Sequence, residues 1–537
     1  MAISQEDFFK KLTGHCKEYG FIYQSSEIYD GLGAVYDYGP LGVELKNNIK
    51  AYWWNAMTQM QDNIVGLDSA IFMHPLIWKA SGHVDAFNDP LIDNKDSKKR
   101  YRADVLIEEY AEKQHQKAQK EIDKARTRFG DSFDEEQYKT TNERVKNYLA
   151  DARNAELRLA KGLEEENLAD IKALIEELGI VCEVSGSKNW TDVRQFNLMF
   201  STQMGGAAGG NDDKLYLRPE TAQGIFVNFL NVQKSSRMKI PFGIAQIGKA
   251  FRNEIVARQF IFRMREFEQM EMQFFVRPGT QMQWYEYWKA QRMQWHLALG
   301  TEANKLRFKD HDKVAHYADA AVDIQFEFPF GMKELEGIHS RTDFDLRQHE
   351  EYSGKKLQYF DQDYTGPINS VLAKKQTSED WKDNHSYVPY VIETSVGCDR
   401  MFLSVLSNAL VEESVPDAKG EDATRTVLSI HPALAPIKCA VLPLLKNKEE
   451  LTTKASEIFN KLKIHVKCQY DEKDAIGRRY RRQDAIGTPY CVTIDFETLE
   501  DGCVTLRDRD TLKQDRVKIE DLPRILVEKT NMTQLFV

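Results

Sequence analysis

Residues 248–276, GKAFRNEIVARQFIFRMREFEQMEMQFFV, constrain the fold of this chain more than any other stretch. Aromatic and apolar side chains recur at close to every second position in its second half, through Met272 and Phe274. This period is typical of a half-buried antiparallel strand. The stretch therefore predicts two strands joined by a loop, the first running into residues 251–254 and the second covering residues 262–275.

The same stretch carries charges that packing does not explain. Its arginines include Arg252, Arg263 and Arg265, which stand near aromatic residues, and several glutamates share the polar face. Buried charges are costly unless they are paired. Arginine holds phosphate through a bidentate fork, and carboxylates hold ammonium groups or metal ions. A solvated outer face also shows mixed charges, and this alternative stays open, but we favour a functional site.

Composition excludes several classes of protein. The chain has 537 residues, which favours two or three domains, and 42% hydrophobic residues, enough for large cores. No long uncharged apolar run is present, and residues 1–11 lack the apolar segment of a signal peptide. The seven cysteines include no C-x-x-C pair, which predicts reduced thiols in a cytoplasm and no evident zinc site. A net charge of −10 does not favour a general nucleic-acid binder, although a local basic groove remains compatible with it.

One resemblance covers nearly the whole chain. Residues 251–254, FRNE, followed by a loop and by residues 265–271, REFEQME, resemble motif 2 of the class II aminoacyl-tRNA synthetases. The full stretch resembles the glycyl-tRNA synthetases of the homodimeric (alpha-2) type. This resemblance implies that glycine is activated with ATP to glycyl-adenylate and pyrophosphate, and is then transferred to the 3′ end of tRNA(Gly). It also implies Mg²⁺ with the ATP, and a cytoplasmic homodimer.

The resemblance also implies the fold. We expect an α+β catalytic domain built on an antiparallel sheet, with a helical insertion and a C-terminal α/β domain of the anticodon-binding kind. The first part of the catalytic domain is expected at 1–94 and the second, with motifs 2 and 3, at 180–432. The charged segment 95–179 predicts long helices, which are solvated hairpins on composition alone and an insertion near the tRNA acceptor end by resemblance. The anticodon-binding domain is expected at 433–537.

Local patterns add further elements. A helix over 41–60 and a strand over 64–75 that ends in proline resemble motif 1, which builds the dimer interface in the family. A short strand is expected at 181–184. After the segment HPALAP, which ends at Pro436, strands and helices alternate, with a turn expected at 499–502. A basic cluster there fits RNA phosphate and a stacked base, with a solvated helix face a nearly equal alternative; it comprises Arg478, Arg479, Tyr480, Arg481 and Arg482.

Three further motifs carry charged groups. Residues 218–221, RPET, stand at a strand-to-helix junction, where the resemblance assigns Glu220 to the glycine ammonium. Glu334 and Glu336 are expected on one strand face, side by side, with a magnesium ion between them. Residues 390–406 predict a strand, a glycine turn and a helix that begins near Arg400, which resembles motif 3.

The resemblance assigns roles to particular positions. Arg252 is expected at the α-phosphate and Arg400 at the far phosphates, while Phe267 stacks on adenine. Arg100 matches an arginine of the substrate pocket, with Arg102 as the alternative. The expected catalytic residues are Arg252, Glu254 and Arg400. The expected ATP-binding residues are Arg252, Asn253, Glu254, Phe262, Arg263, Met264, Arg265, Glu266, Phe267, Glu334, Leu335, Gly397, Cys398, Asp399 and Arg400. The expected glycine-binding residues are Arg100, Glu220, Phe267, Glu268, Gln269, Met270, Glu271, Arg341, Glu393, Thr394, Ser395, Val396 and Gly397.

Three other functions compete with this hypothesis. A threonyl, prolyl or histidyl relative would differ in the amino acid it activates. A catalytically inactive, synthetase-like subunit that binds nucleic acid would not need phosphate-binding arginines and metal-binding acids together, and this chain has both. A structural coiled-coil protein would rest on the charged helices alone and leave the aromatic strands unexplained.

Overall fold

The computed structural model of this chain describes residues 4–130, 133–204, 214–255, 259–311, 314, 318–371, 385–416 and 422–536. Two compact units are present. The first comprises Met1–Ser81, Ser201–Phe251 and Arg258–Val537, and the second comprises Gly82–Phe200 and Arg252–Ala257. No helix among the described residues combines the length and the apolar character that crossing a membrane requires.

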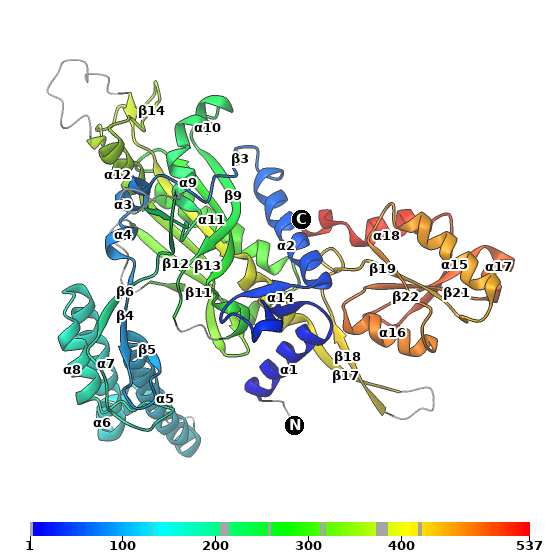
Figure 1. Ribbon diagram of the computed structural model, residues 1–537, viewed down its shortest axis with the longest axis horizontal. Helices are drawn as coiled ribbons and strands as arrows, with labels where there is room; N and C mark the ends of the chain where they lie inside the picture. The colour runs from blue at the N-terminus through cyan, green and yellow to red at the C-terminus, as the bar shows by residue number, and fades with distance from the viewer. Residues whose placement is uncertain are drawn as a thin grey trace. The chain divides into compact units, whose positions relative to one another are not determined.

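A seven-stranded sheet forms the centre of the first unit (Figure 1). Its neighbouring strands run antiparallel, except for β3, which pairs with β9 in parallel at one edge. The predicted antiparallel catalytic sheet is therefore confirmed. In spatial order the strands are β11 (Leu306–Asp310), β12 (Ala320–Phe328), β13 (Gly331–Thr342), β16 (Tyr390–Gly397), β10 (Glu266–Val276), β9 (Phe242–Phe251) and β3 (Ile64–Gly66).

The hairpin predicted from residues 248–276 is present as β9 and β10. Its first strand ends at Phe251, and its second begins at Glu266, after a short 3₁₀ helix at Phe260–Phe262. Side chains of β10 alternate between two surroundings: Met270 and Met272 are fully buried in an apolar core, whereas Glu271 and Gln273 face a polar cluster. This alternation gives the sheet one apolar and one polar face.

Three helices pack on the apolar face. Trp53 and Met57 of one helix, Trp288 of another and Phe402 of the third share a single core with the strands. Because this face is closed by helices, the functional groups gather on the other face. The three helices are α2 (Pro40–Thr58), α11 (Gln281–Leu297) and α14 (Cys398–Ala409).

The motif 1 segment differs from its prediction. The helix predicted at 41–60 is α2, but the strand predicted at 64–75 covers only Ile64–Gly66. Pro75 does not close a strand; it opens the helix α3 (Pro75–Ala80), with His74 accepting a hydrogen bond from the Leu76 N–H as the cap. Proline is favoured at this first helical position because the amide hydrogen it lacks would have no partner within the helix.

The second unit combines a three-stranded sheet with helices. Its strands, in the order β5-β4-β6, are β5 (Arg100–Arg102), β4 (Asn88–Asp93) and β6 (Arg194–Asn197). Its helices are α4 (His83–Ala86), α5 (Ala103–Phe129), α6 (Glu135–Thr141), α7 (Glu143–Glu164) and α8 (Leu168–Glu177). The strand expected at 181–184 is wrong. The chain turns there, and the Gly186 N–H donates to the Cys182 carbonyl at 2.8 Å, a local bond that bends the backbone away from an extended course.

The C-terminal part has the predicted mixed sheet. β19 runs parallel to β20 and β21, whereas β22 and β23 continue the sheet antiparallel. The turn expected at 499–502 is instead the end of a short helix, which begins at a capping box between Asp495 and Thr498. The elements are β19 (Cys439–Pro443), α15 (Glu449–Leu462), β20 (Cys468–Tyr470), α16 (Ile476–Ala485), β21 (Tyr490–Ile494), α17 (Phe496–Asp501), β22 (Cys503–Asp508), β23 (Gln514–Lys518) and α18 (Leu522–Thr530).

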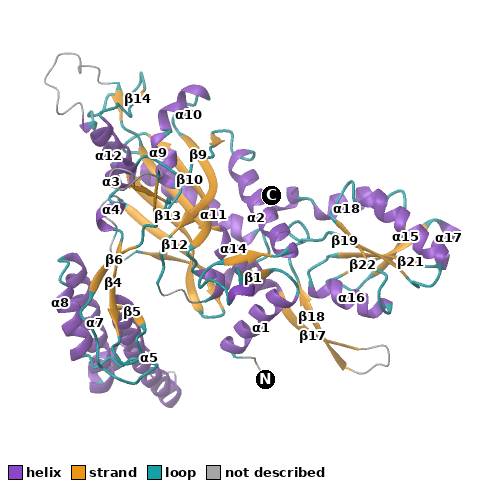
Figure 2. Cartoon of the chain, viewed as in Figure 1, coloured by secondary structure: helices purple, strands orange, loops and turns teal. Residues whose placement is uncertain are grey.

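The remaining elements of the first unit surround the central sheet or connect it to the C-terminal part (Figure 2). They are α1 (Gln5–Glu18), β1 (Ile22–Gln24), β2 (Tyr36–Tyr38), β7 (Ser201–Gln203), β8 (Lys214–Tyr216), α9 (Ala222–Val227), α10 (Phe229–Ser235), α12 (Phe344–Ser353), β14 (Tyr359–Phe360), β15 (Ser386–Tyr387), β17 (Leu410–Pro416) and β18 (Asp422–Leu428).

Candidate active site

Four carboxylates meet on the polar face of the central sheet. Gln273 on β10 stands opposite Glu393 on β16, so Glu271, two residues along β10, faces the same side. Glu220 lies just before α9, and Asp345 lies in the first turn of α12. Sequence analysis predicted Glu220, Glu271 and Glu393 here, and the structure brings them together. It did not predict Asp345, because Arg341 lies in β13 and Asp345 in α12, so that neither strand nor helix periodicity relates the two.

Arg341 of β13 forms ion pairs within this cluster. Its Nη1 donates to Glu393 Oε2 at 2.9 Å, and its Nε and Nη2 donate to the two oxygens of Asp345 at 2.8 and 3.0 Å. Burial disfavours its charge, but Asp345 and Glu393 outweigh that effect and raise the pKa of Arg341. The guanidinium therefore stays charged, and the four carboxylates still exceed it in number.

Neutral side chains connect the carboxylates. Gln273 Nε2 donates to Glu271 Oε1 at 2.8 Å and to Glu393 Oε2 at 2.7 Å. The Thr221 hydroxyl donates to the second oxygen of Glu271. Gln223 Nε2 donates to Glu220 at 2.9 Å, and also to Asp345. Sequence analysis missed Gln223 and Gln273 because an amide in a strand or helix carries no signal of its own.

The surroundings push the pKa values of Glu271 and Glu393 in opposite directions. Burial first, and then the charges of Glu393 and Glu220, raise the pKa of Glu271 well above its usual value. Burial also opposes ionisation of Glu393, but Arg341 and His339 outweigh it and lower the pKa of that carboxyl. The surroundings thus favour the ionised form of Glu393 and the protonated form of Glu271. A pair of this kind is typical of functional sites.

The cluster is built to receive a small cation. Its acidic groups are buried, bonded and in excess over Arg341, which is the condition in which an added ammonium group is stabilised most. Gln269 and Ser395 line the same face: Gln269 Nε2 donates to Ser395 Oγ at 3.5 Å, and its Oε1 accepts from the Thr221 N–H at 3.2 Å. Both residues were predicted for this role.

A second set of residues gathers around Arg400, at the start of α14. Its guanidinium lies 4.5 Å from the ring centre of Phe262, and its Nη1 lies 3.1 Å from Glu334 Oε2. The Arg400 side chain is 23% exposed and that of Glu334 is 50% exposed, so solvent reaches both. The structure thus brings together three of the residues predicted to bind ATP.

The expectation that Glu334 and Glu336 share a cation is wrong. A β-bulge shifts the register of β12 and β13 at this point, so that Gln325 stands opposite Glu334 and Ile324 opposite Glu336. Glu336 is fully buried, with its oxygens 2.5 Å from Arg292 Nε and 2.7 Å from His296 Nε2 of α11. These partners satisfy the carboxylate, and it has no exposed surface to offer a metal ion.

Strand alternation also corrects the expected runs of binding residues. Several members are buried in the apolar core or on its side of the sheet. For those within strands the reason is that neighbouring residues point to opposite faces, whereas Met264 precedes β10 and Cys398 begins α14. The buried members are Met264, Met270, Leu335, Thr394, Val396 and Cys398. They support the site through packing and do not line its polar face.

Two further predicted residues stabilise the fold beneath the site. Asp399 is buried, and its carboxylate accepts bonds from Lys46 Nζ at 2.8 Å, the Glu268 N–H at 2.8 Å and the Tyr38 hydroxyl. Glu268 forms ion pairs with Lys46 at 3.2 Å and Lys50 at 3.3 Å. Sequence analysis missed Lys46. Its spacing of four from Lys50 on α2 predicts that both lysines face one side, but does not say toward which acids.

The loop between β9 and β10 and the start of β10 supply other predicted ATP-binding residues. Arg265 Nη1 donates to the Gly33 carbonyl at 3.2 Å, and Glu266 forms an ion pair with Lys249 at 2.8 Å. Phe267 is half-buried against the central core, and Arg263 is partly exposed. Gly397 ends β16, immediately before α14.

Three residues of the FRNE segment, Arg252, Asn253 and Glu254, belong to the second unit, whereas Phe251 ends β9 in the first. Arg252 lies over the ring of Phe87 at 5.4 Å, and the Asn253 N–H donates to the Leu198 carbonyl at 2.8 Å. Glu254 is buried, with 7% of its surface exposed. In the same unit Arg100 binds Asp93 through two bonds of 2.7 and 3.1 Å, while the alternative, Arg102, forms ion pairs with Asp89 and Asp104.

The basic cluster of α16 is not a uniform RNA-binding face. Arg479 is buried and donates to the carbonyls of Pro443 and Leu444, and Arg482 forms ion pairs with Asp471 and Asp474. The Tyr480 hydroxyl bonds with Thr493, so this ring belongs to the domain interior more than to a stacking surface.

Comparison with known proteins agrees with this architecture. A glycine–tRNA ligase of Chlorobaculum tepidum is 50% identical over 520 residues, which cover 97% of this chain and 99% of the relative. The chain belongs to the glycyl-tRNA synthetase family. A glycine–tRNA ligase of Staphylococcus aureus (strain JH9) is 46% identical over 516 residues, covering 96% of this synthetase and 97% of the relative.

Family models divide this synthetase into three regions. The class II tRNA synthetase core domain (G, H, P, S and T) matches residues 206–409, and the anticodon binding domain matches residues 438–529. The glycyl-tRNA synthetase insertion domain 1 matches residues 89–198. The predicted class and fold are therefore confirmed, and a purely structural coiled-coil protein is excluded.

Proposed function

We propose that this chain is a glycine–tRNA ligase. An oxygen of the glycine carboxylate attacks the α-phosphorus of ATP, and pyrophosphate leaves. The hydroxyl at the 3′ end of tRNA(Gly) then attacks the acyl carbon of the adenylate, and AMP leaves. The first step needs no general base, because the nucleophile is already an anion; it needs positioning and charge stabilisation. The observation that carries the proposal is the excess of buried carboxylates around Arg341.

Glycine offers no side chain for recognition, so its ammonium group is the main group through which the pocket can recognise it. In our proposal Glu271, Glu220 and Glu393 hold this ammonium, and Arg341 keeps the acids from repelling one another. Gln269 and Ser395 complete the polar wall. A rigid wall beside the Cα atom excludes larger amino acids by collision, which discriminates more strongly than the loss of one methylene contact.

ATP is proposed to bind at the Arg400 site. Arg400 contacts the far phosphates and Phe267 stacks on adenine, next to Phe262. Arg252 contacts the α-phosphate with Glu254 beside it, a role that rests on the family motif. The other proposed members are Asn253, Arg263, Arg265, Glu266 and Gly397. Arg100, with Arg102 as the alternative, is proposed at the substrate pocket by the same resemblance.

Magnesium is the metal that the family implies with ATP. The half-exposed carboxylate of Glu334, close to Arg400, fits such an ion, because Mg²⁺ binds one or two carboxylates together with phosphate oxygens. Glu336 does not fit, since Arg292 and His296 already occupy its oxygens. When bound, the ion neutralises charge on the phosphates; the chain's own contribution is to orient them.

We further propose that the enzyme is a homodimer of the alpha-2 type. The supporting observation is the motif 1 segment, where Phe72 is 55% exposed and Leu76 is 47% exposed. Large exposed apolar side chains in a segment that pairs subunits in the family favour a buried position in a dimer. The mass of the particle by light scattering tests this. A cytoplasmic location is proposed on the seven free cysteines.

The test of the function is amino-acid-dependent exchange between ATP and pyrophosphate, measured with each standard amino acid and without tRNA. Exchange with glycine alone is expected. Exchange with threonine, proline or histidine instead would overturn the glycine pocket, and absence of exchange, with tRNA present as well, would favour a nucleic-acid-binding subunit.

A matched pair of variants locates the pocket. Glu220→Ala is expected to raise the glycine concentration needed for half-maximal exchange strongly while the chain stays folded. Glu327→Ala, at an exposed position of β12, is the control and is expected to leave exchange unchanged. Normal glycine dependence in Glu220→Ala would contradict the assignment.

A further inference from the structure

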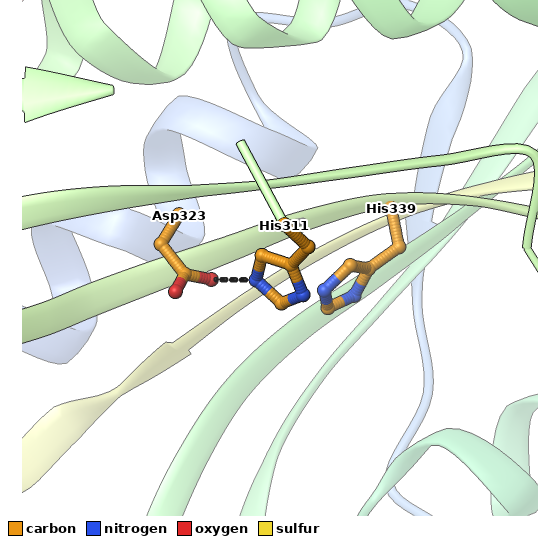
Figure 3. Close-up of side chains that lie close together, drawn as sticks. All are labelled: His311, Asp323 and His339. Carbon is orange, nitrogen blue, oxygen red and sulfur yellow. Dashed lines mark hydrogen bonds and ion pairs between the residues drawn. The ribbon is translucent and has the colours of Figure 1, made fainter. Parts of the chain in front are cut away.

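Two histidines and an aspartate meet on the polar face of the central sheet, at the opposite end from β9. His311 follows β11 and its N–H donates to the Ala321 carbonyl at 3.1 Å, while His339 of β13 stands opposite the same Ala321. Asp323 lies two residues further along β12, so all three side chains share one face. Figure 3 shows the His311 ring between the Asp323 carboxylate and the His339 ring.

The spacing suits a metal ion. One potential ligand atom from each residue lies within 4.8 Å of those of the other two. Among the described residues, this is the one group of three or more His, Cys, Asp or Glu side chains found with that spacing. His311 Nε2 lies 2.9 Å from Asp323 Oδ1, and the two imidazole rings are 5.7 Å apart. Ligands of a tetrahedral zinc ion lie about 3.4 Å apart, so small side-chain rotations suffice.

Small residues leave room for the two rings. Ala321 separates the two histidines on the central strand of the three, and its short side chain does not fill the space between them. Gly337 stands opposite Asp323, and a Cβ atom there would come within 3.0 Å of the His339 ring. The side chains of His311, Asp323 and His339 are 36%, 17% and 20% exposed, so water reaches the group and can complete a coordination sphere.

A carboxylate behind His339 fixes its orientation. His339 Nδ1 lies 2.7 Å from Glu393 Oε1, while Glu393 Oε2 accepts bonds from Arg341 and Gln273. An accepting carboxylate requires the hydrogen on Nδ1, which leaves the lone pair on Nε2. Metal-binding histidines usually have such a carboxylate behind them, because it fixes the tautomer and raises the basicity of the ligand nitrogen.

We propose that His311, Asp323 and His339 form a binding site for one divalent transition-metal ion, of which Zn²⁺ fits best. Two imidazole nitrogens and one carboxylate oxygen favour zinc over magnesium, which prefers oxygen ligands throughout. The site is therefore separate in its chemistry from a magnesium ion bound with ATP at Glu334. No zinc site was evident from the sequence, because the cysteines form no C-x-x-C pair. That pattern concerns thiolate ligands, and the site proposed here has none.

The site has a consequence for the glycine pocket. A metal ion on His339 Nε2 strengthens the Nδ1–H donor and holds Glu393 in place, and Glu393 is a proposed partner of the glycine ammonium. Loss of the metal is therefore expected to raise the KM for glycine more than the KM for ATP. This consequence rests on the proposed function, whereas metal binding itself does not, so the two can fail separately.

Metal binding by the full chain is the experiment. The chain is treated with a chelator, dialysed against Zn²⁺ alone and analysed for bound metal; a parallel sample is loaded with Co²⁺ and its visible spectrum recorded. One equivalent of zinc per chain is expected. Cobalt is expected to give the bands of a four- or five-coordinate site without the strong near-ultraviolet band of a thiolate ligand, which separates this site from the seven cysteines.

Variants identify the ligands. His311→Ala and the shape-conserving Asp323→Asn are expected to weaken zinc binding by more than roughly 100-fold, beyond the effect of losing an outer partner. The control His465→Ala removes an exposed histidine of the C-terminal part and is expected to retain the metal. Zinc that stays bound in both ligand variants, or a wild-type chain that binds no zinc or an adventitious ion only, overturns the proposal.

Discussion

The residue whose chemistry depends most on its surroundings is Glu271. Its carboxyl is buried between Thr221 and Gln273, and burial together with the charges of Glu393 and Glu220 raises its pKa. These surroundings favour the neutral acid while no cation is present. An ammonium group in the cluster favours the carboxylate, so ligand binding and loss of this proton are coupled.

This coupling predicts the pH dependence of glycine binding. Below the raised pKa of Glu271 the acid is protonated, so the dissociation constant for glycine is expected to increase as the pH falls through that pKa. Calorimetric titration of glycine in buffers of different ionisation enthalpy measures the affinity and the protons released. Proton release is expected for the wild-type chain.

Glu271→Gln removes the titrating group but keeps its shape. Loss of a bond to a charged group costs about 1.5–3 kcal/mol, which corresponds to roughly 10- to 100-fold in the dissociation constant. The variant is also expected to lose the pH dependence, while the control Glu327→Gln retains both. If the dissociation constant of Glu271→Gln for glycine depended on pH as in the wild-type chain, the proton would have to come from another group.

At the scale of strands and helices, the sequence predicts what is periodic. The alternation in residues 266–276 and the strand–turn–helix pattern of 390–406 correspond to β10, β16 and α14. These elements carry Glu271, Glu393 and Arg400, and so much of the candidate site was predictable. The insertion helices were predictable from composition, since Lys, Glu, Ala, Arg and Gln dominate that segment.

The remaining elements depend on contacts that local patterns do not report. The bulge in β13 changes which residues of that strand share a face, and it separates Glu334 from Glu336. The capping box at Asp495 turns an expected loop into a helix. The third failed prediction is the strand at 181–184, which has β-branched residues but pairs with no strand among the residues that the structure describes. Each error arises where tertiary contacts or one hydrogen bond outweigh propensity.

The bulge gives a prediction for a matched pair of variants. Glu336→Gln leaves Arg292 as a buried charge without its carboxylate, which is expected to lower the free energy of unfolding by about 3–5 kcal/mol. Glu334→Gln changes a half-exposed residue and is expected to cost less than about 1 kcal/mol, but to weaken ATP binding. Urea unfolding followed by tryptophan fluorescence, together with the KM for ATP, distinguishes them.

In the wild-type chain, the free energy of unfolding is expected to depend on pH through the carboxylate of Glu336. Burial disfavours ionisation of Glu336, but Arg292 and His296 prevail and hold its pKa below the ordinary value of 4.5. Its contribution is therefore complete above pH 4.5 and is lost as the pH falls through the lowered pKa. Equal stability of the two variants, or a greater loss in Glu334→Gln, would contradict the assignment of Glu336 to the core.

At the scale of the whole molecule, a buried ion network joins the C-terminal part to the β17–β18 hairpin. Asp484 of α16 accepts bonds from Arg425 of β18 at 2.9 Å and from Arg507 of β22 at 2.8 and 3.0 Å. Arg509 adds bonds to the carbonyl of Leu428, the last residue of β18, and to that of Ile430 just beyond it. Asp484 thus binds two buried guanidinium groups from different elements, and Glu413 of β17 is a second carboxylate partner of Arg425 at 2.8 Å.

Removal of that carboxylate is expected to separate the two steps of the proposed reaction. Asp484→Asn leaves Arg507 without its anion and Arg425 with Glu413 as its remaining carboxylate partner, at a cost of about 3–5 kcal/mol to the packing between the hairpin and the C-terminal part. Glycine activation uses residues of the central sheet, so exchange between ATP and pyrophosphate is expected to continue at the wild-type rate. Charging of tRNA requires the C-terminal domain in place, and its kcat/KM is expected to fall by at least roughly tenfold, which corresponds to about 1.4 kcal/mol.

The control is Asp501→Asn, the same substitution at the exposed end of α17, where Asp501 pairs with Arg516 of β23 at the surface. It is expected to leave both activities unchanged, because solvent screens this pair. If Asp484→Asn lowers the exchange with glycine as much as it lowers charging, the network stabilises the catalytic sheet itself. If it lowers neither, apolar contacts hold the C-terminal domain in place. The buried charges then contribute specificity of packing but do not measurably stabilise the attachment of this domain.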